Sequence, residues 1–229
     1  MAGTKPPSHQ IWDELLRSSV KPDGMVDYKR FIQDKVKLDQ YLKLISENAP
    51  DRNTWSESEQ LAYWINAYNA FTVKLIVDNY PVKSIRDLGP ALKMPMINDV
   101  WHYKFFEIGG IETSLDEIEH GILRKEFDEP RIHFAINCAS VSCPSLLNEA
   151  FVAGKLESQL SKVAAEFIND PRRNKIAGDQ AQLSSIFSWF KEDFTKRGTL
   201  IDFLNRYSEV KMKPSARISY LDYNWKLNE

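Results

Sequence analysis

The sequence predicts a helix-rich α+β fold in which about six helices pack with a small, mostly antiparallel sheet. Three observations lead to this prediction. Long segments with helical spacing of apolar residues alternate with proline and glycine breaks, short strand-like segments gather in the second half, and no internal repeat divides the chain. We expect a flexible N-terminus over residues 1–10 and a single domain over residues 11–229, a length that one large domain accommodates.

The elements of the first half are predicted to be helices. Apolar spacing predicts a short helix over residues 11–17 and a longer one over residues 31–46. The clearest helix covers residues 61–79, and Ser56 and Glu59 form a capping-box pattern ahead of it. Both sides of this helix are largely uncharged, which indicates that it is central and buried.

The second half is predicted to mix strands with helices. Gly109 and Gly110 supply the turn of a hairpin over residues 103–113, and a helix follows over residues 115–125. Residues 131–137 form a short, mostly apolar run that is typical of a strand covered on both faces. Further helices are expected over residues 152–169, 185–194 and 200–207, with further strands near residues 182–183 and 217–225.

Composition and charge exclude several classes of protein. Hydrophobic residues make up 43% and charged residues 27% of the 229 residues, and the formal net charge is -2. This balance argues against nucleic acid as a partner, and no apolar run is long enough for an integral membrane segment. The first ten residues lack the apolar stretch of a secretory signal. We therefore expect a cytoplasmic protein if the chain is complete, and an exported one if a signal was trimmed.

The densest group of reactive side chains follows the strand predicted over residues 131–137. Cys138 stands at its end, and Cys143 lies five positions further along a run of small and hydroxyl residues. A loop that follows a rigid strand in this way can present a thiol nucleophile to a substrate. Pro144 suits the first turn of a helix, whose N-terminus would favour a Cys143 thiolate. The alternative is that both thiols are merely packed in the core.

The same two cysteines are not expected to form a stable disulfide. The loop between Cys138 and Cys143 is short, so closing it would remove little entropy from the unfolded chain. The intervening residues also include no glycine to permit a tight reversal.

A second group of polar side chains lies on the helix predicted over residues 115–125. Asp116 and His120 are four positions apart on one helix face, Arg124 continues that row, and Glu119 lies on the neighbouring face. A carboxylate beside a histidine fixes its tautomer and raises its basicity, as a general base requires. The alternative is an ordinary charged helix face in contact with solvent.

Two amides stand on the buried helix over residues 61–79. Asn66 and Asn69 are three positions apart, and buried amides need hydrogen-bond partners. They either tie neighbouring loops to the core, or orient a catalytic base or donate to an oxyanion. No metal or cofactor is expected, because the chain contains neither Cys-x-x-Cys nor His-Glu-x-x-His, and no phosphate loop or dinucleotide fingerprint.

Taken together, these clusters resemble the domain-of-unknown-function 547 (DUF547) family, which has no agreed activity. The matching segments are LAYWINAYNA (61–70), YPVKSI (80–85), SLDEIEHGILR (114–124), RIHFAINCAS (131–140) and YLDYNWKLN (220–228). By position, the resemblance points to Asn66, Tyr68, Asn69, Glu119, His120, Arg124, Cys138 and Ser142 as functional residues.

The predicted function is cysteine-dependent acyl transfer, such as hydrolysis of an amide or thioester. Cys138 is the expected nucleophile, His120 the base, and Glu119 or Asp116 the carboxylate that orients His120. The order of His before Cys would suit a permuted papain-like or transglutaminase-like arrangement, by analogy. The alternative is a non-catalytic module whose polar cleft binds an unidentified small molecule or peptide. Supporting or binding roles are expected for Asn66, Tyr68, Asn69, Asp116, Arg124, His133, Asn137 and Ser142.

Overall fold

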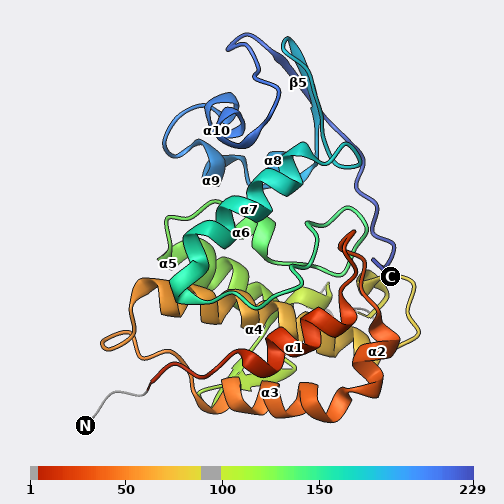
Figure 1. The fold of residues 1–229 in the computed structure, drawn as a ribbon, viewed down its shortest axis with the longest axis vertical. Helices are drawn as coiled ribbons and strands as arrows, with labels where there is room; N and C mark the ends of the chain where they lie inside the picture. The colour runs from red at the N-terminus through yellow and green to blue at the C-terminus, as the bar shows by residue number, and fades with distance from the viewer. Residues whose placement is uncertain (1–4, 89–98) are drawn as a thin grey trace.

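The computed structural model describes residues 5–88 and 99–229, and it has a helix-rich α+β architecture (Figure 1). Its central element is α4, Glu57–Asp78, most of whose side chains are buried, as the sequence predicts. The capping box of Ser56 and Glu59 is present at its N-terminus. It satisfies N–H groups of the first turn that have no partner inside the helix.

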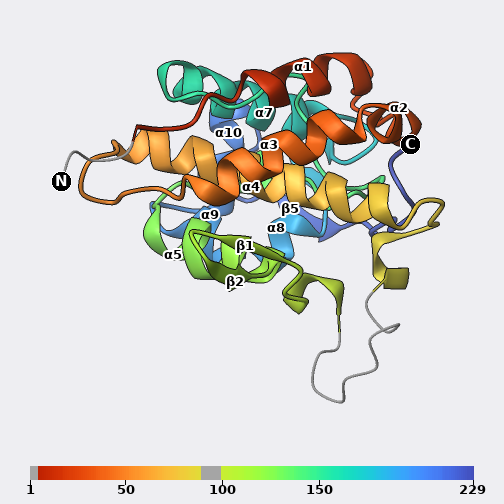
Figure 2. The same cartoon turned by 90° about the horizontal axis from the view of Figure 1, so that it is seen from below.

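The second and third helices pack against α4, and the first packs against both of them (Figure 2). The helix expected over residues 31–46 is in fact two helices that meet at Asp34, which ends the first and precedes the second. Aspartate disfavours a helix interior because its side chain competes for backbone hydrogen bonds, and periodicity alone does not register such a break. The three helices are α1 (Gln10–Ser19), α2 (Tyr28–Gln33) and α3 (Lys35–Glu47).

The predicted hairpin is confirmed as β1 (Phe106–Ile108) and β2 (Ile111–Thr113), with both turn glycines at positive φ. The helix expected after it is also present, but it is wound as a π-helix, η4, over Glu117–Leu123, and continues as α5 (Arg124–Glu126). The wider turns of a π-helix change the direction in which side chains project, and such turns are frequent at functional sites.

The strand predicted over residues 131–137 is wrong. Residues Ile132–Ala135 form one short helix, α6, and the chain becomes extended only after it. A short apolar run buried on every side has the same pattern in a strand and in a helix, so the sequence could not separate them. No helix follows Pro144 either, since residues 143–152 are irregular, and Cys143 is therefore not at a helix N-terminus.

The remaining helices pack mainly on α6 and on one another, and η5 (Ala153–Lys155) packs on α4. The helix expected over residues 185–194 is interrupted at Phe190, which separates two short helices. Their bounds, with those of their neighbours, are α7 (Leu156–Asn169), α8 (Ile186–Trp189), α9 (Lys191–Thr195) and α10 (Leu200–Tyr207). Short 3-10 turns η1 (Ile85–Leu88) and η3 (Val100–His102) flank the undescribed segment.

The described residues contain two small sheets where one is expected. Besides the hairpin, β3 (Lys175–Ile176) pairs antiparallel with β4 (Gln180–Leu183), and β4 pairs in parallel with β5 (Arg217–Tyr220). After β5 the chain runs back along the molecule to end near α2 (Figure 1). There it lies against the cysteine loop, because the Val141 N–H donates to the Lys226 carbonyl at 2.8 Å.

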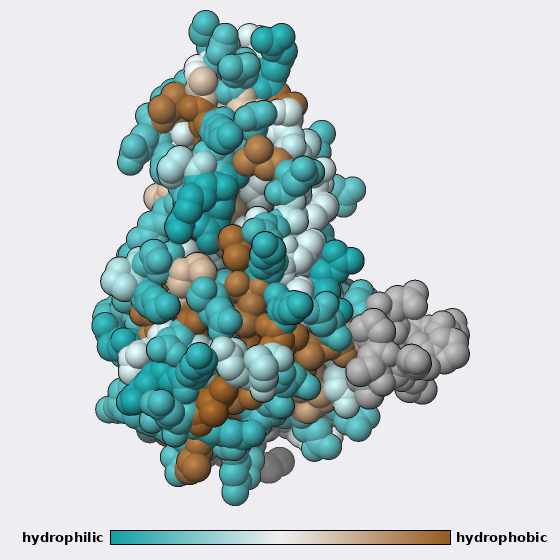
Figure 3. All heavy atoms as spheres, turned by 90° about the vertical axis from the view of Figure 1, so that its right-hand side faces the viewer, coloured by the Kyte–Doolittle hydropathy of each residue, from teal (hydrophilic) through white to brown (hydrophobic). Residues whose placement is uncertain are grey.

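Within the described parts of the chain, no helix is long and apolar enough to cross a lipid bilayer. The face in Figure 3 is mostly hydrophilic, and hydrophobic atoms reach it only in limited groups.

Candidate active site

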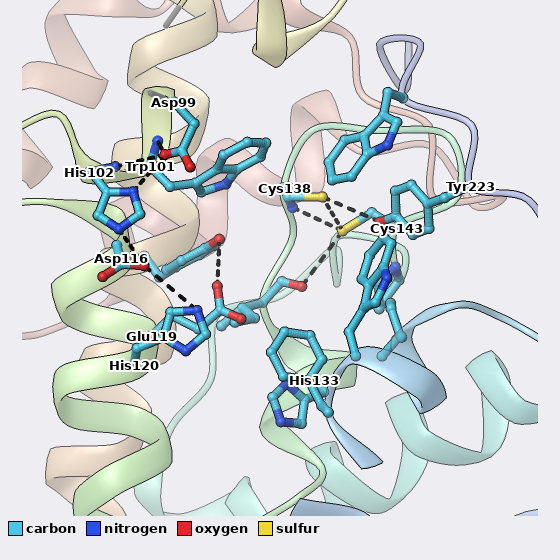
Figure 4. Close-up of a pocket in the computed structure, with 17 residues that line it drawn as sticks. Asp99, Trp101, His102, Asp116, Glu119, His120, His133, Cys138, Cys143 and Tyr223 are labelled. Atoms are coloured by element: carbon cyan, nitrogen blue, oxygen red, sulfur yellow. Dashed lines mark hydrogen bonds and ion pairs between the residues drawn. The ribbon is translucent and has the colours of Figure 1, made fainter. Parts of the chain in front are cut away.

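A cavity of about 280 Å³ brings together side chains from distant parts of the sequence (Figure 4). Six of the residues predicted to be functional line it, contributed by α4, η4 and its cap, α6 and the cysteine loop. They are Tyr68, Asp116, Glu119, His120, His133 and Cys138. The central helix α4, the π-helix η4 and the cysteine loop therefore all contribute side chains to one pocket.

Two free thiols meet at one side of this cavity. The Sγ atoms of Cys138 and Cys143 are 3.0 Å apart, and the Cys138 Sγ also lies 3.3 Å from the Ser140 Oγ and 3.4 Å from the Tyr223 hydroxyl. The hydrogen bond with the Cys143 thiol is the main cause that lowers the pKa of Cys138 to about 7, against the opposing effect of burial. Burial raises the pKa of Cys143 instead. The two thiols therefore differ in character, with Cys138 the more acidic.

The chain reverses at the cysteines without a glycine. Ala139 adopts a φ of 58°, in the left-handed region that glycine usually fills. Asn137 holds this turn, because its Oδ1 accepts from the Ala139 N–H at 2.9 Å and its Nδ2 donates to the Pro144 carbonyl at 2.6 Å. The expectation that a missing glycine prevents a tight reversal is therefore wrong.

Glu119 projects into the cavity between the cysteine side and His120 (Figure 4). The Tyr68 hydroxyl donates to its Oε2 at 3.2 Å. Burial, followed by the neighbouring Cys138, raises the pKa of Glu119 to about 7. A carboxyl with this pKa can both donate and accept a proton near neutral pH.

His120 is held by groups on its own helix. Its Nδ1 accepts a hydrogen bond from Arg124 at 2.7 Å, and its Nε2 lies 3.7 Å from the Asp116 carboxylate. Burial and the charge of Arg124 lower the pKa of His120, although Asp116 opposes them. Of the two carboxylates expected to orient His120, Asp116 is the one beside it, since Glu119 bonds to Tyr68.

His133 is a second imidazole in the cavity wall. Its Nε2 lies 2.8 Å from the Asp193 carboxylate, which also accepts from Arg124, and its ring stacks on Phe190 at 4.0 Å. Burial lowers its pKa. Its Nδ1 is buried and has no hydrogen-bond partner in the part of the chain that the structure describes. No hydrogen bond joins Cys138 to either imidazole within the same residues.

The other predicted residues lie outside the cavity lining and hold its walls. Asn69 and Asn66 each bond to the backbone of a separate loop. The Ser142 Oγ accepts from the Asn224 N–H at 2.9 Å, which joins the cysteine loop to the C-terminal segment. Arg124 donates hydrogen bonds to His120 and to Asp193.

Several lining residues are missed by the sequence interpretation. Asp99 and His102 enter from the segment before the hairpin, and the His102 ring lies 2.8 Å from Asp99 and 3.4 Å from Asp116. The aromatic members are Trp101, Trp189, Phe190, Tyr223 and Trp225. The high aromatic content and the YLDYNWKLN segment are the only sequence features that point to these aromatic residues, and neither indicates which rings face a pocket. Within the described residues, no three His, Cys, Asp or Glu side chains are arranged to hold a metal ion.

Comparison with known families identifies the chain. The family model described as "Protein of unknown function, DUF547" matches residues 52–168, just over half of the sequence. The chain belongs to the DUF547 family. The matched part of this DUF547 protein carries His120, Glu119 and both cysteines, whereas Tyr223 lies beyond it. No curated protein and no solved structure matches the chain, so the permuted papain-like arrangement stays a prediction.

Proposed function

We propose that this DUF547 domain is a cysteine-dependent acyl-transfer enzyme that hydrolyses an amide or thioester, with Cys138 as its nucleophile. One observation carries the proposal: the Cys138 thiol lines a cavity and has a pKa lowered to about 7. The thiolate is the reactive form of cysteine, and it is present at neutral pH when the pKa is in this range. Burial acts in the opposite direction, and it raises the pKa of the neighbouring Cys143 thiol.

The proposed reaction proceeds through an acyl-enzyme. The Cys138 Sγ attacks the substrate carbonyl, an S–C bond forms, and the bond from that carbon to the leaving group breaks. Glu119 protonates the leaving group and then takes a proton from the water that hydrolyses the thioester. Its pKa of about 7 and its place in the cavity support this role. His120, which the sequence predicts as the base, has its ring nitrogens facing Arg124 and Asp116.

A panel of activated esters and thioesters with different acyl groups tests the proposal. Intact-mass and peptide-mapping measurements should show transient addition of one acyl group at Cys138, followed by its loss. Cys138→Ala should show no transient and no turnover. Acylation confined to lysines, or no acylation by any member of the panel, contradicts the proposal.

A binding module without catalysis is the second candidate. The absence of a hydrogen bond between Cys138 and an imidazole, within the described residues, favours it. Under this alternative the Cys138 thiol resists alkylation until the protein unfolds, and Cys138→Ala binds the same ligands as the parent protein.

A further inference from the structure

We propose that the substrate of this site carries an alkylammonium group, either a primary amine or a quaternary ammonium. This inference rests on the proposed function and names the chemical class on which it acts. It depends on two surfaces that face the same cavity. The acidic wall consists of Asp99, Asp116 and Glu119, and the aromatic wall consists of Trp101, Trp189, Tyr223 and Trp225.

The acidic wall gives the cavity an excess of negative charge. Its carboxyl groups share the space with two imidazoles. The His102 ring contacts both Asp99 and Asp116, and the His120 ring lies 3.7 Å from Asp116. Glu119 has a pKa raised to about 7 and is only partly ionised at neutral pH, so the negative charge comes mainly from the two aspartates. The pKa of His102 is raised mainly by the hydrogen bond to Asp99, whereas that of His120 is lowered by burial, so a single imidazolium does not offset two aspartates. No lysine or arginine is among the described lining residues.

The arginines nearest the cavity are already engaged. Arg124 forms a two-point ion pair with Asp193 and reaches His120 from outside the lining. Arg86 lies over the ring of Trp225, with 5.2 Å between its guanidinium carbon and the ring centroid. Among the described lining residues, a substrate anion would therefore meet carboxylates and find no lysine or arginine to pair with.

The aromatic wall suits an organic cation. Its rings form a continuous surface. The ring centroid of Tyr223 lies 4.5 Å from that of Trp225 and 4.8 Å from that of Trp189, and the ring centroids of Trp101 and Trp225 are 5.5 Å apart. The π-face of tryptophan attracts ammonium and guanidinium groups, and the Arg86 guanidinium already lies over the ring of Trp225.

The thiol lies within reach of both walls. The Tyr223 hydroxyl, from the aromatic wall, is 3.4 Å from the Cys138 Sγ, and the charge of Cys138 raises the pKa of Glu119 on the acidic wall. In Figure 4, Asp99, Asp116 and Glu119 occupy the side of the cavity opposite Tyr223. An acyl substrate held between the walls would place its ammonium group near the acidic residues and its carbonyl near the sulfur.

The rates at which charged and neutral reagents modify Cys138 would report the charge preference of the cavity. Three methanethiosulfonates of similar size, bearing trimethylammonium-ethyl, hydroxyethyl and sulfonatoethyl groups, each transfer their thioalkyl group to a thiolate and release methanesulfinate. Rate constants would be measured on Cys143→Ser, which leaves one thiol, and divided by those of free 2-mercaptoethanol. We expect the normalised ratio of cation to anion to exceed one by about tenfold or more at low salt.

Charge variants locate the effect. Asp116→Asn should lower the normalised ratio by about threefold, because it removes one charge from the acidic wall. Glu112→Gln, at an exposed site on β2, should leave it unchanged. A normalised ratio within about twofold of one, with Cys138 still reactive, overturns the ammonium inference and leaves the proposed enzyme intact.

Failure of Cys138 to react with any of the three reagents contradicts the proposed enzyme, and a binding measurement then decides the charge preference. Tryptophan fluorescence of Cys138→Ser would be titrated with choline and with its uncharged isostere, in which carbon replaces nitrogen. Choline binding about tenfold more tightly supports the ammonium inference. Equal or weaker binding of choline overturns it.

Discussion

The side chain of Asn69 on α4 clamps the segment that leads to Cys138. Its Nδ2 donates to the Ala135 carbonyl at 2.9 Å, and its Oδ1 accepts from the Asn137 N–H at 2.8 Å. One turn earlier, Asn66 makes the same pair of bonds to the backbone of Phe151. Two amides on one buried helix thus fix two different loops, and only one of those loops carries the thiol.

This relationship supplies a matched pair of variants. Asn69→Ala and Asn66→Ala should each lower the free energy of unfolding by about 2–4 kcal/mol, because each leaves two buried backbone groups unpaired. Only Asn69→Ala should also slow the alkylation of Cys138 in the folded protein. Denaturant titration and alkylation rates check this, and equal effects of both variants on the rate would contradict the clamp.

Glu119→Gln is expected to change stability with a defined dependence on pH. Burial raises the pKa of this carboxyl from 4.5 to about 7, so the folded state binds a proton that the unfolded state releases between those values. The stabilisation is therefore complete below pH 4.5 and is lost as the pH rises through 7. Above pH 7 the variant should be more stable than the parent by about 1–2 kcal/mol, allowing for partial exposure of the group.

Thermal or denaturant unfolding across this pH range would test the sign. The difference between Glu119→Gln and the parent protein should vanish at the acidic end. Glu112→Gln is the control, because that exposed side chain should show no such pH-dependent difference. A variant that is less stable than the parent above pH 7 would show that Glu119 is stabilised as a carboxylate.

Substitutions at Glu119 and His120 would show which of the two side chains transfers the proton during turnover. If Glu119 moves the proton, Glu119→Gln should slow turnover of the best ester or thioester by about 10²–10⁴-fold, and His120→Asn by less than about tenfold. Steady-state rates on one substrate give both numbers. The reverse order would assign the base to His120, as the sequence predicts, and would require its ring to turn away from Arg124.

Cys138 and Cys143 are expected to stay reduced in the folded protein, although their sulfur atoms are only 3.0 Å apart. The bond would close a short loop, which constrains the unfolded chain little. Thiol counting on the folded protein, without added reductant, should find two free thiols. Finding none in a monomer would show that the pair forms an internal disulfide.

Local sequence patterns predict caps and tight turns better than they predict contacts between distant segments. The capping box of Ser56 and Glu59 and the Gly109-Gly110 turn are local signals, and both are present as predicted. The α6 turn was mistaken for a strand, because burial on all sides removes periodicity. The pairing of Cys138 with Tyr223 joins residues 85 positions apart, and no local pattern encodes such a contact.

The roles of individual site residues were harder to predict for the same reason. Asp116 lies beside His120, as helical spacing predicts. The bond of Glu119 to Tyr68 depends instead on the packing of η4 against α4, and the two residues are 51 positions apart in the sequence.

The pH dependence of Cys138 alkylation tests the central claim most directly. Iodoacetamide rates at Cys138 and Cys143, resolved by peptide mass mapping, would be followed from acidic to alkaline pH. We predict that Cys138 reacts in the folded protein with a midpoint at about pH 7, and that Cys143→Ala moves this midpoint upward while Cys143→Ser, which keeps a donor, moves it less. A Cys138 midpoint at or above the ordinary value of 9.0, or reaction only after unfolding, would contradict a nucleophilic Cys138.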